Sequence, residues 1–320
     1  MLTPAGVTAI PRTATPAGVD PHHNACNRWC RFARPPANGW EPSGFIKAES
    51  HRIITPPPLL AIDVGNSRIK YGWFAAEPSP SGRVWPVCRE FVATTLATAL
   101  PWDVLRGWAD PLTCPVAVAG SNPAVVEQVA THWEATTGRR PWVVRNRSLL
   151  PVEVDVDFPE KVGLDRLLNA VAANELRPPA QPAIVINSGT ATTVDYLSAD
   201  GVFRGGTILP GLALSSQALH HYTALLPQLS LADLGPDVPM PLGRNTRDAL
   251  RSGIYWGQVG AIRTLIDALS LTTPTAPWLV LTGGGSRWLS SQFPDVQTVP
   301  SLGMHGLTLT AWRHGLGSDS

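Results

Sequence analysis

Apolar residues recur from Leu59 onward with two periods, one typical of buried strands and one typical of amphipathic helices. Short apolar runs predict strands at 59–63, 69–74, 84–91, 116–120, 142–144, 183–186, 192–197 and 279–282. Capping signals and apolar stripes predict helices at 123–136, from about 163, and at 212–222, 246–269 and 304–313. Strands that alternate with helices twice over predict an α/β fold with two halves around a cleft.

Two predicted strand pairs are joined by short turns of the same design. The first turn runs through Gly65, Asn66 and Ser67, and the second through Ser188, Gly189 and Thr190. Backbone N–H groups in such turns can form a concavity that holds phosphate oxygens. Two such turns, about 120 residues apart, predict a duplicated fold with phosphate held between its halves. Each turn alone is also explained as ordinary hairpin chemistry, in which Gly-Asn is common.

An Asp-Arg pair opens the helix predicted from about residue 163. Leu164 belongs to the apolar stripe, so Asp165 and Arg166 point away from the core. A helix dipole favours a carboxylate in the first turn, which explains Asp165 without any function and predicts a low pKa. The functional interpretation is a base for a substrate hydroxyl, with the planar guanidinium of Arg166 binding a substrate anion.

Glycine clusters mark three further positions. The run 205–211 predicts a tight crossing into the helix at 212–222. Gly283, Gly284 and Gly285 follow a buried strand, where they form either a plain tight turn or a surface for an adenosine ring. Small residues at 253, 257 and 260 of the long predicted helix indicate close packing against another helix.

Composition adds limits to this picture. Residues 1–58 hold ten of the 32 prolines and few aliphatic residues, so they are predicted to be a disordered extension. The formal net charge is +1, which favours neither nucleic acid nor membrane as a partner. Four cysteines form no recognisable framework, which indicates a cytoplasmic protein. The remaining chain is divided into halves at 59–180 and 181–320.

From about residue 59 to 315 the motifs resemble those of the type III pantothenate kinases, in the superfamily of acetate kinase, sugar kinases, Hsp70 and actin. The resemblance is carried by Leu60–Lys70, Val162–Arg166 with Asn169–Ala173, Gly189–Asp195, Gly205–Gly211, Thr223–Pro227, Ser252–Gly257 and Thr282–Gly284. It implies two duplicated ribonuclease-H-like (actin-like ATPase) halves around a nucleotide cleft. It also implies ATP-dependent phosphorylation of pantothenate, the first step of coenzyme A biosynthesis.

The resemblance also assigns roles by motif position. Asp165 resembles the proton acceptor, and the substrate contacts are Gly163, Leu164, Asp165, Arg166 and Thr223. The ATP contacts are Asp63, Val64, Gly65, Asn66, Ser67, Arg68, Ile69, Lys70 and Thr190. Asp63 is also the expected Mg²⁺ ligand, directly or through water. The family further implies a monovalent cation, K⁺ or NH₄⁺, and a homodimer with the site near its interface.

Two departures from the family pattern affect this expectation. Asn187 stands where the family has an acidic ligand of the monovalent cation, so cation binding is expected to be weaker or dispensable. Val156 stands where the family often has a Tyr in the pantothenate pocket, so the KM for pantothenate is expected to be higher. The alternatives are a catalytically weakened regulator resembling Bvg accessory factor, and a sugar or acetate kinase of the same superfamily.

Overall fold

The computed structural model describes residues 56–78, 84–96, 99–235 and 237–316. The extension predicted to be disordered lies outside these ranges, apart from Pro56, Pro57 and Pro58. Within them, the strands form two five-stranded sheets. In the described part of the chain no helix is both long enough and apolar enough to cross a bilayer.

The first sheet contains an antiparallel meander followed by two parallel strands. Its order is β3-β2-β1-β4-β5, with β1 antiparallel to β2 and parallel to β4. The strands are β1 (Leu59–Val64), β2 (Arg68–Pro78), β3 (Val84–Thr95), β4 (Val116–Gly120) and β5 (Trp142–Val143). The predicted strands of this half are therefore confirmed, with β2 and β3 longer than their apolar runs.

The second sheet repeats this topology strand for strand. Its order is β10-β9-β6-β7-β8, with β6 antiparallel to β7 and parallel to β9. The strands are β6 (Ala183–Ser188), β7 (Ala191–Leu197), β8 (Phe203–Pro210), β9 (Trp278–Thr282) and β10 (Gln297–Thr298). The predicted α/β fold with two duplicated ribonuclease-H-like halves is confirmed by this repetition.

One prediction for the second half is wrong. The glycine-rich run 205–211 is not a crossing but most of β8, which pairs antiparallel with β7. Its side chains alternate between exposed and less exposed positions, as they do on the outermost strand of a sheet. Gly206 lies opposite Asp195 on β7, where a Cβ would overlap both the Asp195 carboxylate and the carbonyl of Val194. Gly206 therefore permits a close approach between strands rather than a turn.

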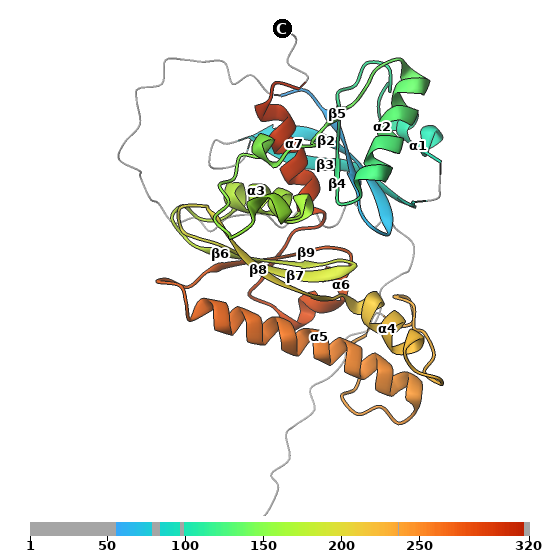
Figure 1. Cartoon of the computed structure of the whole chain (residues 1–320), viewed down its shortest axis with the longest axis vertical. Helices are drawn as coiled ribbons and strands as arrows, with labels where there is room; N and C mark the ends of the chain where they lie inside the picture. Colours follow the sequence, from blue (N-terminus) through green and yellow to red (C-terminus); the bar gives the residue numbers. More distant parts are fainter. Residues whose placement is uncertain (1–55, 79–83, 97–98, 236, 317–320) are drawn as a thin grey trace, which may run out of the picture. The chain divides into compact units, whose positions relative to one another are not determined.

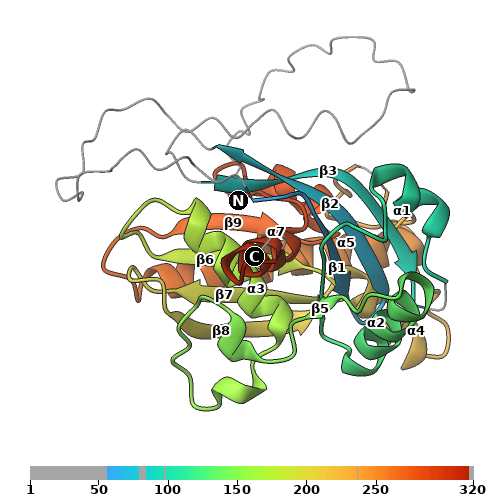
Figure 2. The same ribbon diagram turned by 90° about the horizontal axis from the view of Figure 1, so that it is seen from above.

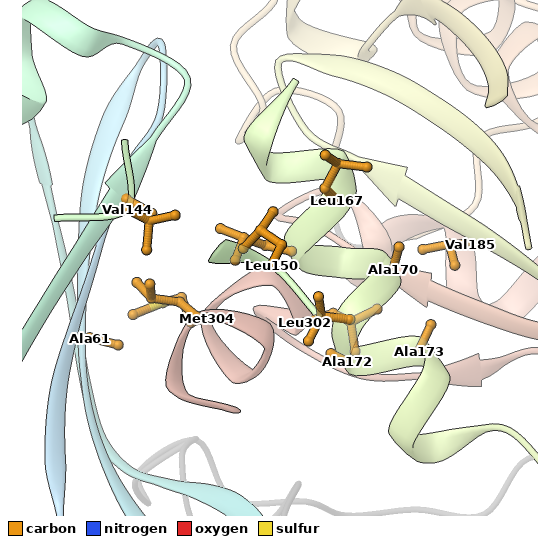
Figure 3. Packing of buried hydrophobic residues seen from close by; sticks show 14 of the residues in the cluster. Ala61, Val144, Leu150, Leu167, Ala170, Ala172, Ala173, Val185, Leu302 and Met304 are labelled. Atoms are coloured by element: carbon orange, nitrogen blue, oxygen red, sulfur yellow. The ribbon is translucent and has the colours of Figure 1, made fainter. Parts of the chain in front are cut away.

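Two helices lie between the sheets and join them through one apolar core. They are α3 (Leu164–Leu176) and α7 (Leu302–Arg313), and each follows the last strand of its half. Ala61 and Val144 reach this core from the first half, and Val185 reaches it from the second (Figure 3). The helices cross closely, since a Cβ at Gly306 would overlap the carbonyl of Leu168.

The remaining helices cover the outer faces of the sheets (Figures 1 and 2). The first sheet packs against α1 (Trp102–Trp108) and α2 (Pro123–Thr137). Asn122 caps the start of α2 and Gly138 ends it in the left-handed conformation, as predicted. The second sheet packs against α5 (Thr246–Ser270), and α4 (Leu212–His221) packs against the start of α5. A single turn, α6 (Ser286–Leu289), links β9 to β10.

Candidate active site

The two turns predicted to hold phosphate meet in the structure. The β1–β2 turn contains Ser67 and the β6–β7 turn contains Thr190, and their hydroxyl oxygens lie 2.9 Å apart. The residues are separated by 123 positions in the sequence. The duplicated halves thus bring their equivalent turns together, as a shared phosphate site requires.

Each turn leaves backbone donors unused. The N–H of Gly65 donates to the carbonyl of Arg68 (2.9 Å), and that of Gly189 donates to Ala191 (3.1 Å). Among the described residues, no acceptor lies in hydrogen-bond position for the N–H groups of Asn66, Ser67 and Thr190. Exposed amide donors of this kind fit the oxygens of a phosphate chain. Two side chains of the predicted ATP segment, Val64 and Ile69, are buried in the core, so only their backbone can serve a ligand.

A carboxylate and an ammonium group flank the first turn. Asp63 is the penultimate residue of β1, and its Oδ2 lies 2.7 Å from Nζ of Lys70 on β2. The Asp63 side chain is 16% exposed and that of Lys70 is 36% exposed, so both remain accessible to a ligand. The described residues contain no group of three or more His, Cys, Asp or Glu side chains that could hold a metal ion. One carboxylate supplemented by phosphate oxygens and water is nevertheless a common Mg²⁺ environment.

The predicted base lies in the first turn of α3. Gly163 is the N-cap residue, and a Cβ there would lie 2.6 Å from Oδ1 of Asp165, so the absence of a side chain makes room for this carboxylate. Burial raises the pKa of Asp165, and the nearby negative charge of Asp63 raises it further. Backbone N–H groups and the guanidinium of Arg166 oppose this increase. The low pKa expected from the helix dipole is therefore wrong in direction, because desolvation exceeds the effect of the helix terminus.

Arg166 is held by a buried acid that the sequence interpretation did not select. Its Nε donates to Oδ1 of Asp195 at 2.9 Å, and its Nη2 donates to the same oxygen. Its guanidinium also lies over the ring of Phe203, 5.3 Å from the centroid. Burial raises the pKa of Asp195, and Arg166 and Thr193 oppose that increase. A charged residue inside a strand that is predicted to be buried is rare, which is the sequence signal that could have identified Asp195.

Asn187 lies beside both glycine turns of the second half. It is the fifth residue of β6, and its Oδ1 lies 3.8 Å from the position of a Cβ at Gly189 and 2.5 Å from one at Gly283. Gly283 has φ of 89°, and a Cβ there would also overlap the carbonyl of Ser188. The glycine turn after β9 is therefore a tight turn that packs on the β6–β7 turn. Open space surrounds Gly284.

The departure at Val156 and the predicted substrate contact Thr223 lie in different surroundings. Val156 packs near β8, with Cγ1 3.6 Å from the position of a Cβ at Gly205. Thr223 is exposed just after α4, and its hydroxyl donates to the carbonyl of Leu219 (2.6 Å). The opposite end of α4 contacts the β6–β7 turn, where the N–H of Gly211 donates to the backbone carbonyl of Thr190. At 1.5 Å per residue, about 15 Å of helix separates Thr223 from that turn.

A surface cavity of about 510 Å³ lies elsewhere, on the α1–α2 side of the first half. Its lining includes Trp102, Arg106 and Leu112, and none of the predicted site residues. The candidate site is thus defined by the convergence of the turns and of Asp165, and not by this cavity.

Comparison with known proteins agrees with these features. A family model described as type III pantothenate kinase matches residues 59–268, which is more than half of the chain. A type III pantothenate kinase of Ruegeria sp. is 33% identical over 74% of this chain and 89% of its own. Another, from Gluconobacter oxydans, is 39% identical over 54% of this chain and 63% of its own length.

A solved structure described as belonging to the Baf family of transcriptional activators, from Campylobacter jejuni, superposes with a TM-score of 0.50. The superposition covers 80% of this chain and 98% of that one at 16% sequence identity. A likeness at this identity establishes the shared fold alone.

Proposed function

The chain belongs to the type III pantothenate kinases, and from that membership we propose that it transfers the γ-phosphoryl group of ATP to the primary hydroxyl of pantothenate. This reaction is the first step of coenzyme A biosynthesis. The observation that carries the proposal is the meeting of the two turns at Ser67 and Thr190, with the carboxylate of Asp165 close enough to sense the charge of Asp63.

ATP is bound by the segment from Asp63 to Lys70 together with Thr190. The unused N–H groups of Asn66, Ser67 and Thr190 donate to phosphate oxygens, and the Lys70 ammonium neutralises part of their charge. The Ser67–Thr190 contact gives way to the phosphate chain, so that each hydroxyl donates to an oxygen instead. Asp63 has the chemistry and exposure to hold Mg²⁺, directly or through water, and the ion would neutralise charge on the transferred group.

Asp165 acts as the base for the acceptor hydroxyl. The proton passes to Asp165 as the hydroxyl oxygen bonds to the γ-phosphorus, and the bond to the bridging oxygen breaks with departure of ADP. A raised pKa makes this carboxylate a better proton acceptor than an ordinary Asp. Gly163 and Leu164 shape the segment that contacts pantothenate, and the Arg166 guanidinium binds the pantothenate carboxylate.

A monovalent cation, K⁺ or NH₄⁺, binds weakly or not at all at Asn187. The amide Oδ1 beside the second turn can coordinate a cation but brings no net charge. Turnover is therefore expected to change little with KCl, and Asn187→Asp is expected to introduce a KCl dependence. A wild-type activity that requires KCl would contradict this assignment.

The active form is a homodimer. Small residues at 253, 257 and 260 share one exposed face of α5, and no described atom lies within 4 Å of a Cβ built at any of them. Within the described part of the chain no helix packs on this face, so a second copy is the occupant we assign for the expected helix packing. Large apolar side chains are also exposed in the segment between α4 and α5, at Tyr222, Leu225, Met240 and Leu242.

Light scattering on a size-exclusion column tests the dimer, with Gly257→Glu expected to yield monomers. A wild-type monomer would contradict it.

Thr223, exposed in the segment between α4 and α5, contacts pantothenate in the dimer, so Thr223→Ala is expected to raise the KM for pantothenate. The halves divide near residue 180, between α3 and β6. The four cysteines, which form no recognisable framework, support a cytoplasmic location, and cell fractionation tests it.

Product analysis tests the reaction directly. Purified protein, ATP, Mg²⁺ and pantothenate are expected to yield ADP and 4′-phosphopantothenate in equal amounts by mass spectrometry. Glucose and acetate serve as control acceptors and are expected to release no ADP. Nothing specific supports the regulatory alternative, because the likeness to the Baf family structure establishes the fold alone.

A further inference from the structure

A buried ion pair lies directly beside the proposed base. The side chain of Asp195 is 2% exposed and that of Arg166 is 13% exposed. Both Nε and Nη2 of Arg166 donate to Oδ1 of Asp195, and the Thr193 hydroxyl donates to Oδ2 at 3.0 Å. Burying two charges costs desolvation energy, and their attraction offsets this cost only when the geometry of the pair is well defined. Stability alone therefore does not explain such a pair beside the terminus of the helix that carries Asp165.

The surroundings fix the guanidinium from several directions. Its central carbon lies over the ring of Phe203. Gly206, opposite Asp195 on β8, has no Cβ that would displace the carboxylate. Thr193 and Asp195 lie two residues apart on β7 and so share one face of the strand. The side chain of Arg166, which begins on α3, is thus positioned by the second sheet.

The pairing decides which edge of Arg166 can bind a substrate. A guanidinium offers two edges for a carboxylate, one formed by Nε with Nη2 and one formed by Nη1 with Nη2. Asp195 occupies the first edge. No described residue pairs with Nη1, so the second edge is the one left for a ligand.

We propose that Asp195 is a positioning residue that holds Arg166 so that its Nη1–Nη2 edge receives the carboxylate of pantothenate. The inference rests on the proposed function, since it concerns the acceptor of the same reaction. Asp195 touches no substrate and acts only through Arg166. Removal of its charge frees the guanidinium to rotate, and the acceptor loses a pre-oriented partner.

Steady-state kinetics of Asp195→Asn test the proposal. The KM for pantothenate is expected to rise roughly tenfold or more, the cost of a weakened charge-assisted contact. The KM for ATP is expected to stay the same, and kcat is expected to change less. A merely structural role would alter both substrates alike or reduce only the amount of folded protein.

Pantothenol, which carries an alcohol in place of the carboxylate, supplies a second measurement. The wild type is expected to prefer pantothenate over pantothenol, and Asp195→Asn is expected to lose most of this preference. Glu77→Gln is the matched control, because it breaks an exposed ion pair with Arg89 on β3 and is expected to leave both acceptors unaffected.

Thr193 provides variants in case Asp195→Asn fails to fold. Thr193→Val removes the hydroxyl that holds Oδ2 of Asp195, and Thr193→Ser keeps it. The Val variant is expected to raise the KM for pantothenate a few fold, and the Ser variant is expected to match the wild type.

Unchanged preference for pantothenate in folded Asp195→Asn, or in Thr193→Val where the former does not fold, would overturn the positioning role and leave the proposed function intact. No turnover of pantothenate by the wild type would instead overturn the proposed function, and the role of Asp195 with it.

Discussion

The hydroxyl of Ser67 lies 2.9 Å from the hydroxyl of Thr190, which comes from the equivalent turn of the other half. Both side chains are exposed, so the contact itself contributes little to stability. Its significance is positional, because it places two sets of unused backbone N–H groups around one point. A phosphate chain bound there would be gripped by both halves of the duplicated fold.

Removal of either hydroxyl is expected to weaken ATP binding. In Ser67→Ala and Thr190→Val, a hydrogen bond to a charged phosphate is lost, which corresponds to about 1.5–3 kcal/mol and so to roughly tenfold or more in KM for ATP. The KM for pantothenate and the melting temperature are expected to stay near the wild-type values. Thr190→Ser, which keeps the hydroxyl, is the control, and equal KM values for ATP in Val and Ser variants would contradict the assignment.

Gly163→Ala is expected to displace the base without unfolding the helix. The N-cap angles of Gly163, φ −61° and ψ 137°, are accessible to Ala, but its Cβ would lie 2.6 Å from Oδ1 of Asp165. A misplacement of this order can reduce kcat roughly a hundredfold. Stopped-flow or steady-state turnover measures the loss, with ADP affinity as the control. Turnover equal to that of the wild type would mean that the carboxylate position is unimportant.

The buried His305 is expected to make stability depend on pH. Its ring stacks on Trp85 at 5.0 Å, meets the edge of Phe74 at 5.1 Å, and bonds through Nδ1 to the carbonyl of Pro86. Burial lowers the pKa of His305 to about 4. Between pH 6.5 and 4 the unfolded chain binds a proton that the folded chain excludes. The free energy of unfolding therefore decreases by up to about 3 kcal/mol as the pH is lowered through this range.

Urea unfolding of wild type and His305→Gln at several pH values checks this expectation. The variant is expected to be less stable at pH 7 but to lose less stability towards pH 4. The raised pKa values of Asp165 and Asp195 act in the opposite direction, but they are present in both proteins and cancel in the difference. Parallel curves for the two proteins would exclude His305 as the source of the dependence.

Gly306→Ala is expected to destabilise the core that joins the halves. A Cβ at this position of α7 would overlap the carbonyl of Leu168 on α3, and backbone cannot rotate away as a side chain can. A cost of about 1–3 kcal/mol or more in the free energy of unfolding is expected. Gly107→Ala, at an exposed position of α1, is the control, since no described atom lies within 4 Å of a Cβ built there. A Gly306→Ala variant as stable as that control would contradict the close crossing.

Local patterns predicted most of the fold because each element agrees with its own signal. Asn122 and Gly138 bound α2 by capping chemistry that acts within a few residues. The prediction of a tight crossing at 205–211 is wrong because Gly206 allows a close approach to β7. A single sequence does not reveal which strand lies opposite. The pairing of strands is a tertiary property.

The sequence motifs predict the parts of the site that are local in the chain. The turns at Gly65 and Gly189 and the helix start at Asp165 are local features, and the structure brings them together. The direction in which the pKa of Asp165 shifts could not be predicted, because desolvation depends on packing from distant segments. For the same reason the pairing of Arg166 with Asp195, 29 positions away, lay beyond any local pattern.

In the proposed reaction, Asp165 accepts the proton of the pantothenate hydroxyl while both turns hold ATP. Pantothenate-dependent ADP release by Asp165→Asn, compared with the wild type at equal ADP affinity, tests it most directly. A loss of roughly a hundredfold to ten-thousandfold in kcat is expected, because the amide cannot accept the proton. Turnover by Asp165→Asn at the wild-type rate would contradict it.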